Sequence, residues 1–154
     1  MTIYEKYGGY DFFHQCIYGL YLEMFDHPEI AYHFIGVDLE WLSRQQTHYL
    51  IRAIGGPDLY EGGTVKEVHA HMGITKFQYT EIAIAFRQVF LDRGVSKEDT
   101  DVIMNFVASH ATDIVTRKTS LIDQIMRPIY RTIRKLFGWC LPKKNSWIRS
   151  GKFK

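Results

Sequence analysis

One histidine stands out as a residue that could do chemistry. His69 lies in a short segment that begins at Thr64 and ends at Gly73, and Val65 and Met72 lie on its side of the helix. A helix of barely two turns is not stable alone, so a tether such as a bond from the imidazole to a metal ion would stabilise it. An isolated histidine is more often a core or surface residue bonded to a nearby carbonyl group. His69 by itself leaves both interpretations open.

Two polar side chains interrupt apolar helix faces elsewhere. Tyr21 is the polar tip on the apolar face of a helix predicted over 11–26, and Gln46 interrupts the stripe of a helix predicted after Asp38. Such groups can orient a ligand held between helices. The alternatives are an interfacial tyrosine with its hydroxyl in water and a glutamine on the surface. The residues alone do not decide between them.

Helix signals dominate the first 116 residues. Three threonines have the spacing of a capping box with a Glu or Gln three residues later: Thr2 with Glu5, Thr64 with Glu67 and Thr75 with Gln78. Glycines at Gly8-Gly9, Gly55-Gly56, Gly62-Gly63, Gly73 and Gly94 indicate where helices end. Two further helices are predicted over 76–93 and from 97 onward, and they look like the main core pair. No segment has the alternation of a strand, so the fold class is all-α.

Length and composition favour one globular domain with an appendage. The chain has 154 residues, of which 46% are hydrophobic and 15% aromatic, which is enough for a sizeable core. Cys16 and Cys140 make neither a disulfide framework nor a paired metal spacing, so both are expected as thiols. No signal peptide and no membrane-spanning run is recognisable. We therefore expect a cytoplasmic protein.

The charge is distributed unevenly along the chain. Residues 117–154 carry 11 Lys+Arg against the single acidic residue Asp123, whereas residues 1–116 carry 8 Lys+Arg against 16 Asp+Glu. This split predicts two parts, 1–117 and 118–154. Apolar residues between Leu121 and Phe137 recur at helical spacing, with basic side chains and Trp139 nearby. The pattern suggests an amphipathic helix on an anionic membrane surface. The alternative is that the stripe packs on the body or on a second subunit.

The order of residues over about 2–117 resembles a group I truncated haemoglobin. The residues that carry the resemblance are Ile3-Tyr4-Glu5-Lys6, Gly8-Gly9, Tyr21, Pro28-Glu29-Ile30, Phe34, Gln46, Gly55-Gly56-Pro57, Tyr60, Gly62, His69, Gly73-Ile74-Thr75 and Asp113-Ile114-Val115. Turn glycines, polar pocket residues and the histidine all occur in register. The resemblance implies a two-over-two helical sandwich around haem, followed here by a C-terminal amphipathic helical extension.

The resemblance also implies roles for particular residues. His69 matches the proximal histidine that binds haem iron, and Tyr21 and Gln46 match the distal pair that donates hydrogen bonds to bound oxygen. The haem is expected to be haem b (iron protoporphyrin IX). Besides His69, the residues expected to contact it are Phe34, Leu42, Tyr49, Met72, Ile74 and Tyr79.

Two positions depart from some relatives. At Gln45 those relatives have a histidine that binds iron as a sixth ligand, or a basic side chain that reaches a haem propionate. Because this chain has Gln45, and apolar Leu42 at the pocket mouth, we expect an open sixth position on ferrous iron. Leu50 stands where some relatives have a bulky aromatic residue lining a ligand tunnel. The sequence therefore makes no prediction of how ligand entry through such a tunnel is gated.

Three functional interpretations follow. The first is a haem protein that binds dioxygen and other diatomic gases such as NO and CO reversibly. The second is a nitric oxide dioxygenase, in which Tyr21 and Gln46 would be the catalytic residues, nitric oxide and oxygen give nitrate, and a reductase partner restores ferrous iron. The third is a gas sensor whose basic tail finds the inner face of a membrane by electrostatics. No specific nucleic-acid site is predicted.

Overall fold

The computed structural model describes residues 1–118, 120–121, 125, 128–129 and 132. The helices are α1 (Ile3–Lys6), α2 (Gly9–Phe25), the 3-10 helix η1 (Ala31–Phe34), α3 (Leu39–Ala53), α4 (Val65–His69), α5 (Lys76–Asp92), α6 (Lys97–Ser109) and α7 (Ala111–Ile114). Within the described ranges no strand occurs, and a single bridge pairs Thr75 with Arg117. The prediction of an all-α fold is confirmed.

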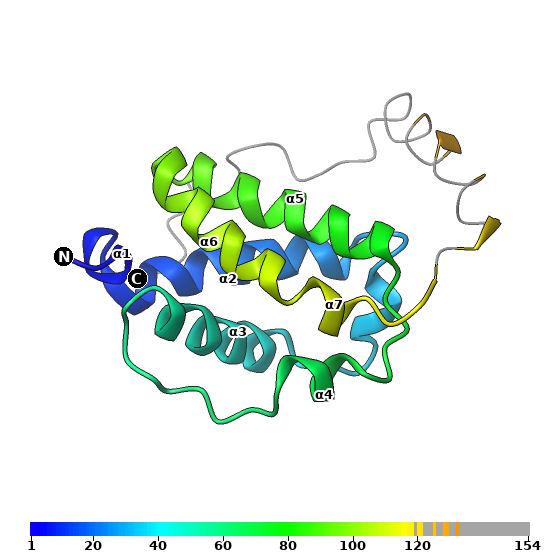
Figure 1. Cartoon of the computed structure of the whole chain (residues 1–154), viewed down its shortest axis with the longest axis horizontal. Coiled ribbons are helices and arrows are strands. Elements are labelled where there is room, and N and C mark those ends of the chain that lie inside the picture. The colour runs from blue at the N-terminus through cyan, green and yellow to red at the C-terminus, as the bar shows by residue number, and fades with distance from the viewer. Residues whose placement is uncertain (119, 122–124, 126–127, 130–131, 133–154) are drawn as a thin grey trace. The chain divides into compact units, whose positions relative to one another are not determined.

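Two pairs of helices form the body of the molecule (Figure 1). α2 packs along α3, α5 packs along α6, and α2 also contacts α5, which brings the two pairs together. The short helices α4 and α7 lie against each other beside this body. A space between helix pairs is where a flat prosthetic group can be held by side chains from facing elements.

Helix α2 supplies most of the core. Its buried side chains are Phe13, Cys16, Ile17, Leu20 and Met24, and they meet Leu50 and Ile51 of α3, Phe86 and Phe90 of α5 and Ile103 of α6. The expectation that α5 and α6 form the main core pair is therefore corrected, because α2 contacts both α3 and α5 and contributes the most buried side chains. Cys16 is a free thiol as expected, and burial raises its pKa to about 12.

All three predicted capping boxes are present. Thr2, Thr64 and Thr75 each accept a hydrogen bond from the backbone three residues later, and the Glu or Gln there accepts from the threonine backbone N–H in return. The Gln78 side chain also donates from Nε2 to the Glu29 carbonyl at 2.8 Å. These bonds satisfy backbone amides that the first turn of a helix leaves unpaired.

The glycine pair after α3 lets the N-terminus approach closely. A Cβ at Gly56 would lie 2.7 Å from the Tyr4 ring, and one at Gly55 would lie 2.6 Å from the Thr2 side chain. Gly55 also has a φ of +89°, a backbone conformation that residues with a side chain rarely adopt. The Tyr4 N–H donates to the Ile54 carbonyl at 3.1 Å, so α1 is fixed against the end of α3.

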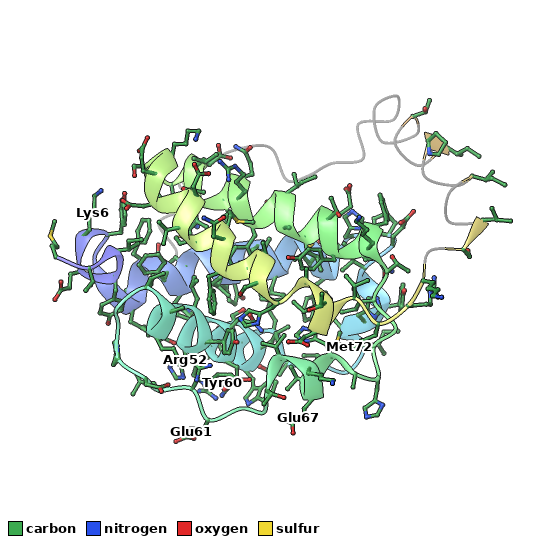
Figure 2. The ribbon with its side chains drawn as sticks, in the orientation of Figure 1. Lys6, Arg52, Tyr60, Glu61, Glu67 and Met72 are labelled. Atoms are coloured by element: carbon green, nitrogen blue, oxygen red, sulfur yellow. The ribbon has the colours of Figure 1, made fainter. Side chains whose placement is uncertain are left out.

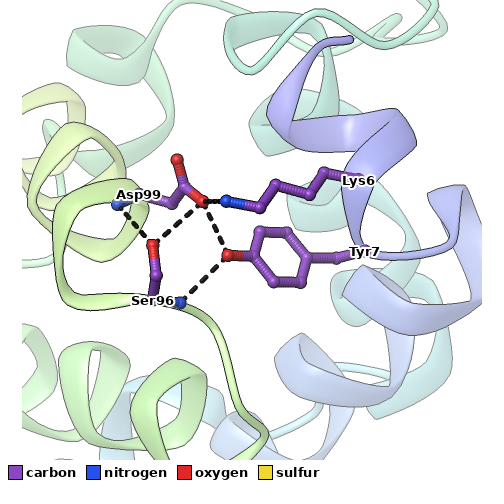
Figure 3. Close-up of polar contacts among 4 residues, drawn as sticks. All are labelled: Lys6, Tyr7, Ser96 and Asp99. Atoms are coloured by element: carbon purple, nitrogen blue, oxygen red, sulfur yellow. Dashed lines mark hydrogen bonds and ion pairs between the residues drawn. The ribbon is translucent and has the colours of Figure 1, made fainter.

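A polar cluster joins α1 to the start of α6 (Figure 3). Asp99 Oδ2 accepts from Lys6 Nζ at 2.6 Å, from the Tyr7 hydroxyl at 2.6 Å and from the Ser96 hydroxyl at 3.0 Å. The Ser96 backbone N–H donates to the Tyr7 oxygen at 3.0 Å. Together these bonds lower the pKa of Asp99, with the Lys6 bond as the largest cause.

Removal of the Tyr7 hydroxyl should destabilise the fold. We expect Tyr7→Phe to lower the free energy of unfolding by about 1–2 kcal/mol, because the part-buried Ser96 N–H and one bond to Asp99 lose their partner. Urea unfolding followed by circular dichroism measures the difference. Tyr10→Phe on α2 is the control, since that hydroxyl makes none of these contacts. Equal unfolding midpoints for the two variants would contradict the assignment.

The first 118 residues form one compact unit, and the chain from Thr119 belongs to a second. The first unit closes where the N–H groups of Thr116 and Arg117 both donate to the Ile74 carbonyl, at 3.0 and 3.1 Å. Most of the predicted extension, including its Trp residues, Cys140 and every lysine after Lys118, lies outside the described residues. Within the described part of the chain, no helix has the length and apolar character needed to cross a bilayer.

Candidate functional site

His69 is the last residue of α4, a helix of five residues rather than the two turns predicted. Its Nδ1 lies 2.7 Å from the Val65 carbonyl oxygen. Because a carbonyl oxygen can only accept, Nδ1 carries the proton and Nε2 keeps its lone pair. Burial lowers the pKa of His69, the Val65 bond raises it, and nearby His110 lowers it again. The imidazole is therefore held neutral with one nitrogen free to bind a metal.

The residues that follow His69 turn the chain towards α5. Met72 donates its N–H to the His69 carbonyl at 3.1 Å, which makes a turn in place of a further helical residue. Met72 is half-buried and Ile74 is buried. Figure 2 shows Met72 at the end of this turn, beyond α4. Both predicted haem contacts therefore lie directly after His69, next to the interior of the molecule.

Tyr21 lies near the end of α2 in an aromatic group with η1. Its ring meets Phe34 edge to face, with centroids 5.7 Å apart, and Phe34 stacks on Phe25 at 4.8 Å. Burial raises the pKa of Tyr21, so the phenol stays protonated. The side chain nevertheless keeps accessible surface. A side chain that is closely surrounded by protein atoms and still keeps some accessible surface is compatible with a position at the edge of a cavity.

Helix α3 carries the other predicted distal residues. Leu42 and Gln46 are half-buried and lie one turn apart, so they share a face of the helix. Leu42 packs against the same core cluster as Tyr21. The Oε1 atom of Gln45 is buried and has no hydrogen-bond partner among the described residues. A buried amide oxygen without a partner is uncommon in native proteins and points to an unfilled polar contact.

Tyr49 and Tyr79 have hydroxyl groups that are already engaged. The Tyr49 hydroxyl lies 3.0 Å from His110 Nε2, and its ring packs on Tyr60 and Phe106. Tyr79 donates to the Val107 carbonyl at 3.1 Å. Both side chains are half-buried, so a haem contact would be made by their rings and not by their hydroxyls.

The predicted site residues form two groups. Tyr21 and Phe34 are in ring contact on the α2 side, while His69 lies with Val65 and close to His110 on the α4 side. Among the residues described, no hydrogen bond or ring contact joins Tyr21 to Gln46 or to His69. The two groups therefore lie on different elements, and no contact among the described residues links them directly.

The residues present fit a haem group. His69 offers Nε2 with its second nitrogen held by a carbonyl, which is the arrangement that orients a metal-binding imidazole. Tyr21 is half-buried with its phenol protonated, and Gln45 supplies a buried polar atom without a partner among the described residues. Bonding of His69 to a carbonyl, the less specific interpretation of the sequence, is thus compatible with metal binding through Nε2.

The partners of His110 could not be read from the sequence. The structure pairs its imidazole with the Tyr49 hydroxyl and places it close enough to His69 to lower the pKa of that residue. The pair is 61 residues apart in the chain, so no local spacing could have indicated it. The buried oxygen of Gln45 was also missed, although Gln45 itself was noted.

Two helix pairs and a half-buried histidine on a short separate helix are features of a globin of the two-over-two type. The chain belongs to the bacterial-like globin family, whose model matches residues 2–116. The predicted resemblance to truncated haemoglobins is confirmed.

Individual relatives agree with this assignment. The chain is 26% identical over 115 residues to the group 1 truncated haemoglobin GlbN of Mycolicibacterium paratuberculosis, a match that covers 75% of this chain and 85% of the relative. It is 27% identical over 107 residues to the group 1 truncated haemoglobin of Tetrahymena pyriformis, covering 70% and 85%.

Solved structures share the fold. The Fe(III) form of the truncated haemoglobin from Tetrahymena pyriformis superposes with a TM-score of 0.69 at 23% identity, covering 75% of this chain and 98% of that one. The group II truncated haemoglobin of Bacillus anthracis gives a TM-score of 0.66 at 27% identity, covering 79% and 95%.

Proposed function

We propose that this protein binds dioxygen and other diatomic gases reversibly at ferrous haem b, with His69 as the axial ligand. The observation that supports this most directly is the bond between His69 Nδ1 and the Val65 carbonyl, which leaves Nε2 available on a neutral imidazole. Globins are haem proteins that bind gas ligands, which gives the same expectation. The bound haem supplies the iron atom at which the gas is held.

Tyr21 and Gln46 are proposed as the distal hydrogen-bond donors. A protonated Tyr21 hydroxyl with no partner among the described residues is free to donate to a gas ligand. The Tetrahymena pyriformis protein has been solved with a tyrosine replaced by phenylalanine, and with each of two glutamines, 21 and 25 residues later, replaced by glutamate. Leu42 and Gln46 follow Tyr21 at the same separations. This register supports Tyr21 and Gln46 as a pair and Leu42 as the apolar departure.

Visible absorption spectra test the proposal. We expect the purified protein to show haem bands that differ between the ferric, deoxygenated ferrous and oxygenated forms, with the oxygenated spectrum reverting when oxygen is removed. A folded protein that takes up no haem would reject the proposal. A ferrous haem that is oxidised at once by oxygen, with no reversible intermediate spectrum, would reject the carrier or storage role.

The ferrous protein should leave one coordination position open. We expect a five-coordinate, high-spin spectrum under nitrogen, because Leu42 has no ligand atom and the amide of Gln45 is a poor ligand for iron compared with imidazole. The variant Gln45→His is the matched control and should give a six-coordinate, low-spin spectrum. A low-spin spectrum from the unaltered protein would contradict the prediction.

Conversion of nitric oxide to nitrate is the second candidate function. The apolar side chain of Leu42 favours it, because Tyr21 and Gln46 would then be the two hydrogen-bond donors to the gas, with no third polar group at position 42. A reductase and an electron donor would be needed to keep a bound haem in the ferrous state. Repeated loss and recovery of the oxygenated spectrum with nitric oxide and a reductase would support catalysis. A single stoichiometric cycle would limit the protein to gas binding.

A gas sensor at the inner face of the cytoplasmic membrane is the third candidate. Leu121, Ile125 and Ile129 recur at helical spacing and are exposed, which supports an apolar contact surface in the proposed extension 118–154. Co-sedimentation with anionic liposomes should be lost in a protein that ends at Lys118. Equal binding by both forms would reject membrane attachment through the extension.

A further inference from the structure

A cavity beside α4 is not assigned to any function. Its volume is about 310 Å³, and it opens between α3, the segment before α4, and α7. The charged and aromatic side chains that line it are Tyr49, Arg52, Tyr60, Lys66, His110 and Asp113. Figure 2 shows Arg52 and Tyr60 next to each other on this side of the molecule. The volume is at the lower end of the range for small-molecule sites.

Arg52 is held in place by two aromatic rings. Its guanidinium carbon lies 4.6 Å from the ring centroid of Tyr49 and 5.2 Å from that of Tyr60, and these rings meet edge to face at 4.9 Å. The only ion pair of Arg52 among the described residues is with the exposed Asp58, at 3.7 Å. A stacked guanidinium keeps its N–H groups in one plane, which suits recognition of a carboxylate or phosphate. Arg52 is thus a preorganised hydrogen-bond donor for an anion.

The charges around the cavity select the ligand class. Arg52 and Lys66 are cationic, and Asp113 is the single acidic side chain in the lining. His110 Nε2 is taken up by the Tyr49 hydroxyl. An anion would therefore be attracted to the Arg52 and Lys66 side, while the Asp113 carboxylate would accept a hydrogen bond from a hydroxyl group on the same molecule.

We infer that this cavity binds a small organic anion that carries a carboxylate or phosphate group and a hydroxyl. Its occupant would touch Val65, the residue whose carbonyl holds His69, and would also contact α3 and α7. The groups that would recognise the anion are Arg52, Lys66 and Asp113, and none of them is proposed to contact haem. Tyr49, whose ring packs on Arg52, is the lining residue that is also proposed as a haem contact.

Ligand-dependent thermal stability tests the site on the full chain. The probes are citrate and glycerol 2-phosphate, each compared with sodium chloride at equal ionic strength to remove general screening. We expect a saturable rise in Tm of roughly 3–6 °C at ten times Kd. The tighter of the two probes, measured by calorimetry, identifies carboxylate or phosphate as the preferred group. A rise no larger than that with sodium chloride for both probes would overturn the inference.

Matched variants locate the binding. Arg52→Gln and Lys66→Gln should each weaken binding at least about tenfold, whereas Arg44→Gln, an exposed arginine on the same helix, should not change it. Lys66 is exposed, so its replacement tests the site even if Arg52→Gln impairs folding. Equal affinity in all of these proteins would overturn the inference.

The hydroxyl preference has its own comparison. Tricarballylate differs from citrate only by lacking the hydroxyl group, so it should bind at least about tenfold more weakly if Asp113 accepts a hydrogen bond from that group. In Asp113→Ala, citrate and tricarballylate should bind with equal affinity. A preference for citrate that persists in this variant would overturn the role given to Asp113.

Discussion

Replacement of His69 by glycine should abolish ordinary haem binding. We expect the affinity for haem to fall by roughly 100-fold or more, which exceeds the loss typical when only a supporting partner of a metal ligand is removed. The physical reason is that Nε2 of this half-buried, neutral imidazole is the group proposed to bind iron. Haem transfer to an acceptor globin, followed by absorption, measures the change.

Added imidazole separates a ligand role from a folding role. If His69 only stabilises α4, imidazole in solution should leave the His69→Gly spectrum unchanged. If His69 binds iron, imidazole should occupy the vacated space and restore the histidine-type spectrum. The control is His71→Gly, two residues along and exposed, which should keep its haem. Comparable haem loss in both variants would remove His69 from its proposed role.

Loss of the Tyr21 hydroxyl should accelerate oxygen release. We expect Tyr21→Phe to raise the dissociation rate about 10- to 150-fold, because a hydrogen bond to a group with charge contributes about 1.5–3 kcal/mol. The ring contact with Phe34 does not involve the hydroxyl, so the packing should remain. Stopped-flow replacement of oxygen by carbon monoxide measures the rate.

A double-mutant cycle tests whether the two donors act together. Gln46→Leu should also speed release, and the combined variant should deviate from additivity if both side chains donate to the same ligand. Tyr10→Phe on the same helix is the control, because that ring packs on His14 and not on Phe34. An unchanged rate in Tyr21→Phe would mean that the distal hydrogen bond has been assigned to the wrong residue.

Features set by neighbours in the chain were predictable from the sequence. Each capping box depends on two residues three positions apart, and all three are present. Asp38 caps α3 as expected, accepting from the Trp41 N–H at 2.6 Å. α4 was predicted too long, because the pattern could not distinguish a helical turn from the tighter turn that Met72 closes on His69.

Features set by distant residues were not predictable. The Tyr7 and Asp99 side chains are 92 residues apart, and Tyr49 and His110 are 61 apart, so neither pair has a local signature. Periodicity also gave no measure of which helix is most enclosed, which is why α2 was underestimated as the centre of the core. The haem assignment came from the resemblance in register and not from any single spacing.

The carbonyl of Ile74 indicates where the globin part of this chain is complete. Ile74 is buried, with 4% of its surface exposed. Among the described residues, the donors to its backbone carbonyl oxygen are the N–H groups of Thr116 and Arg117. A chain cut after Val115 would leave that oxygen without these donors, whereas one cut after Lys118 would keep both. The backbone therefore completes the first unit before most of the basic residues begin. A change in the length or charge of the sequence after Lys118 would therefore leave both of these bonds in place.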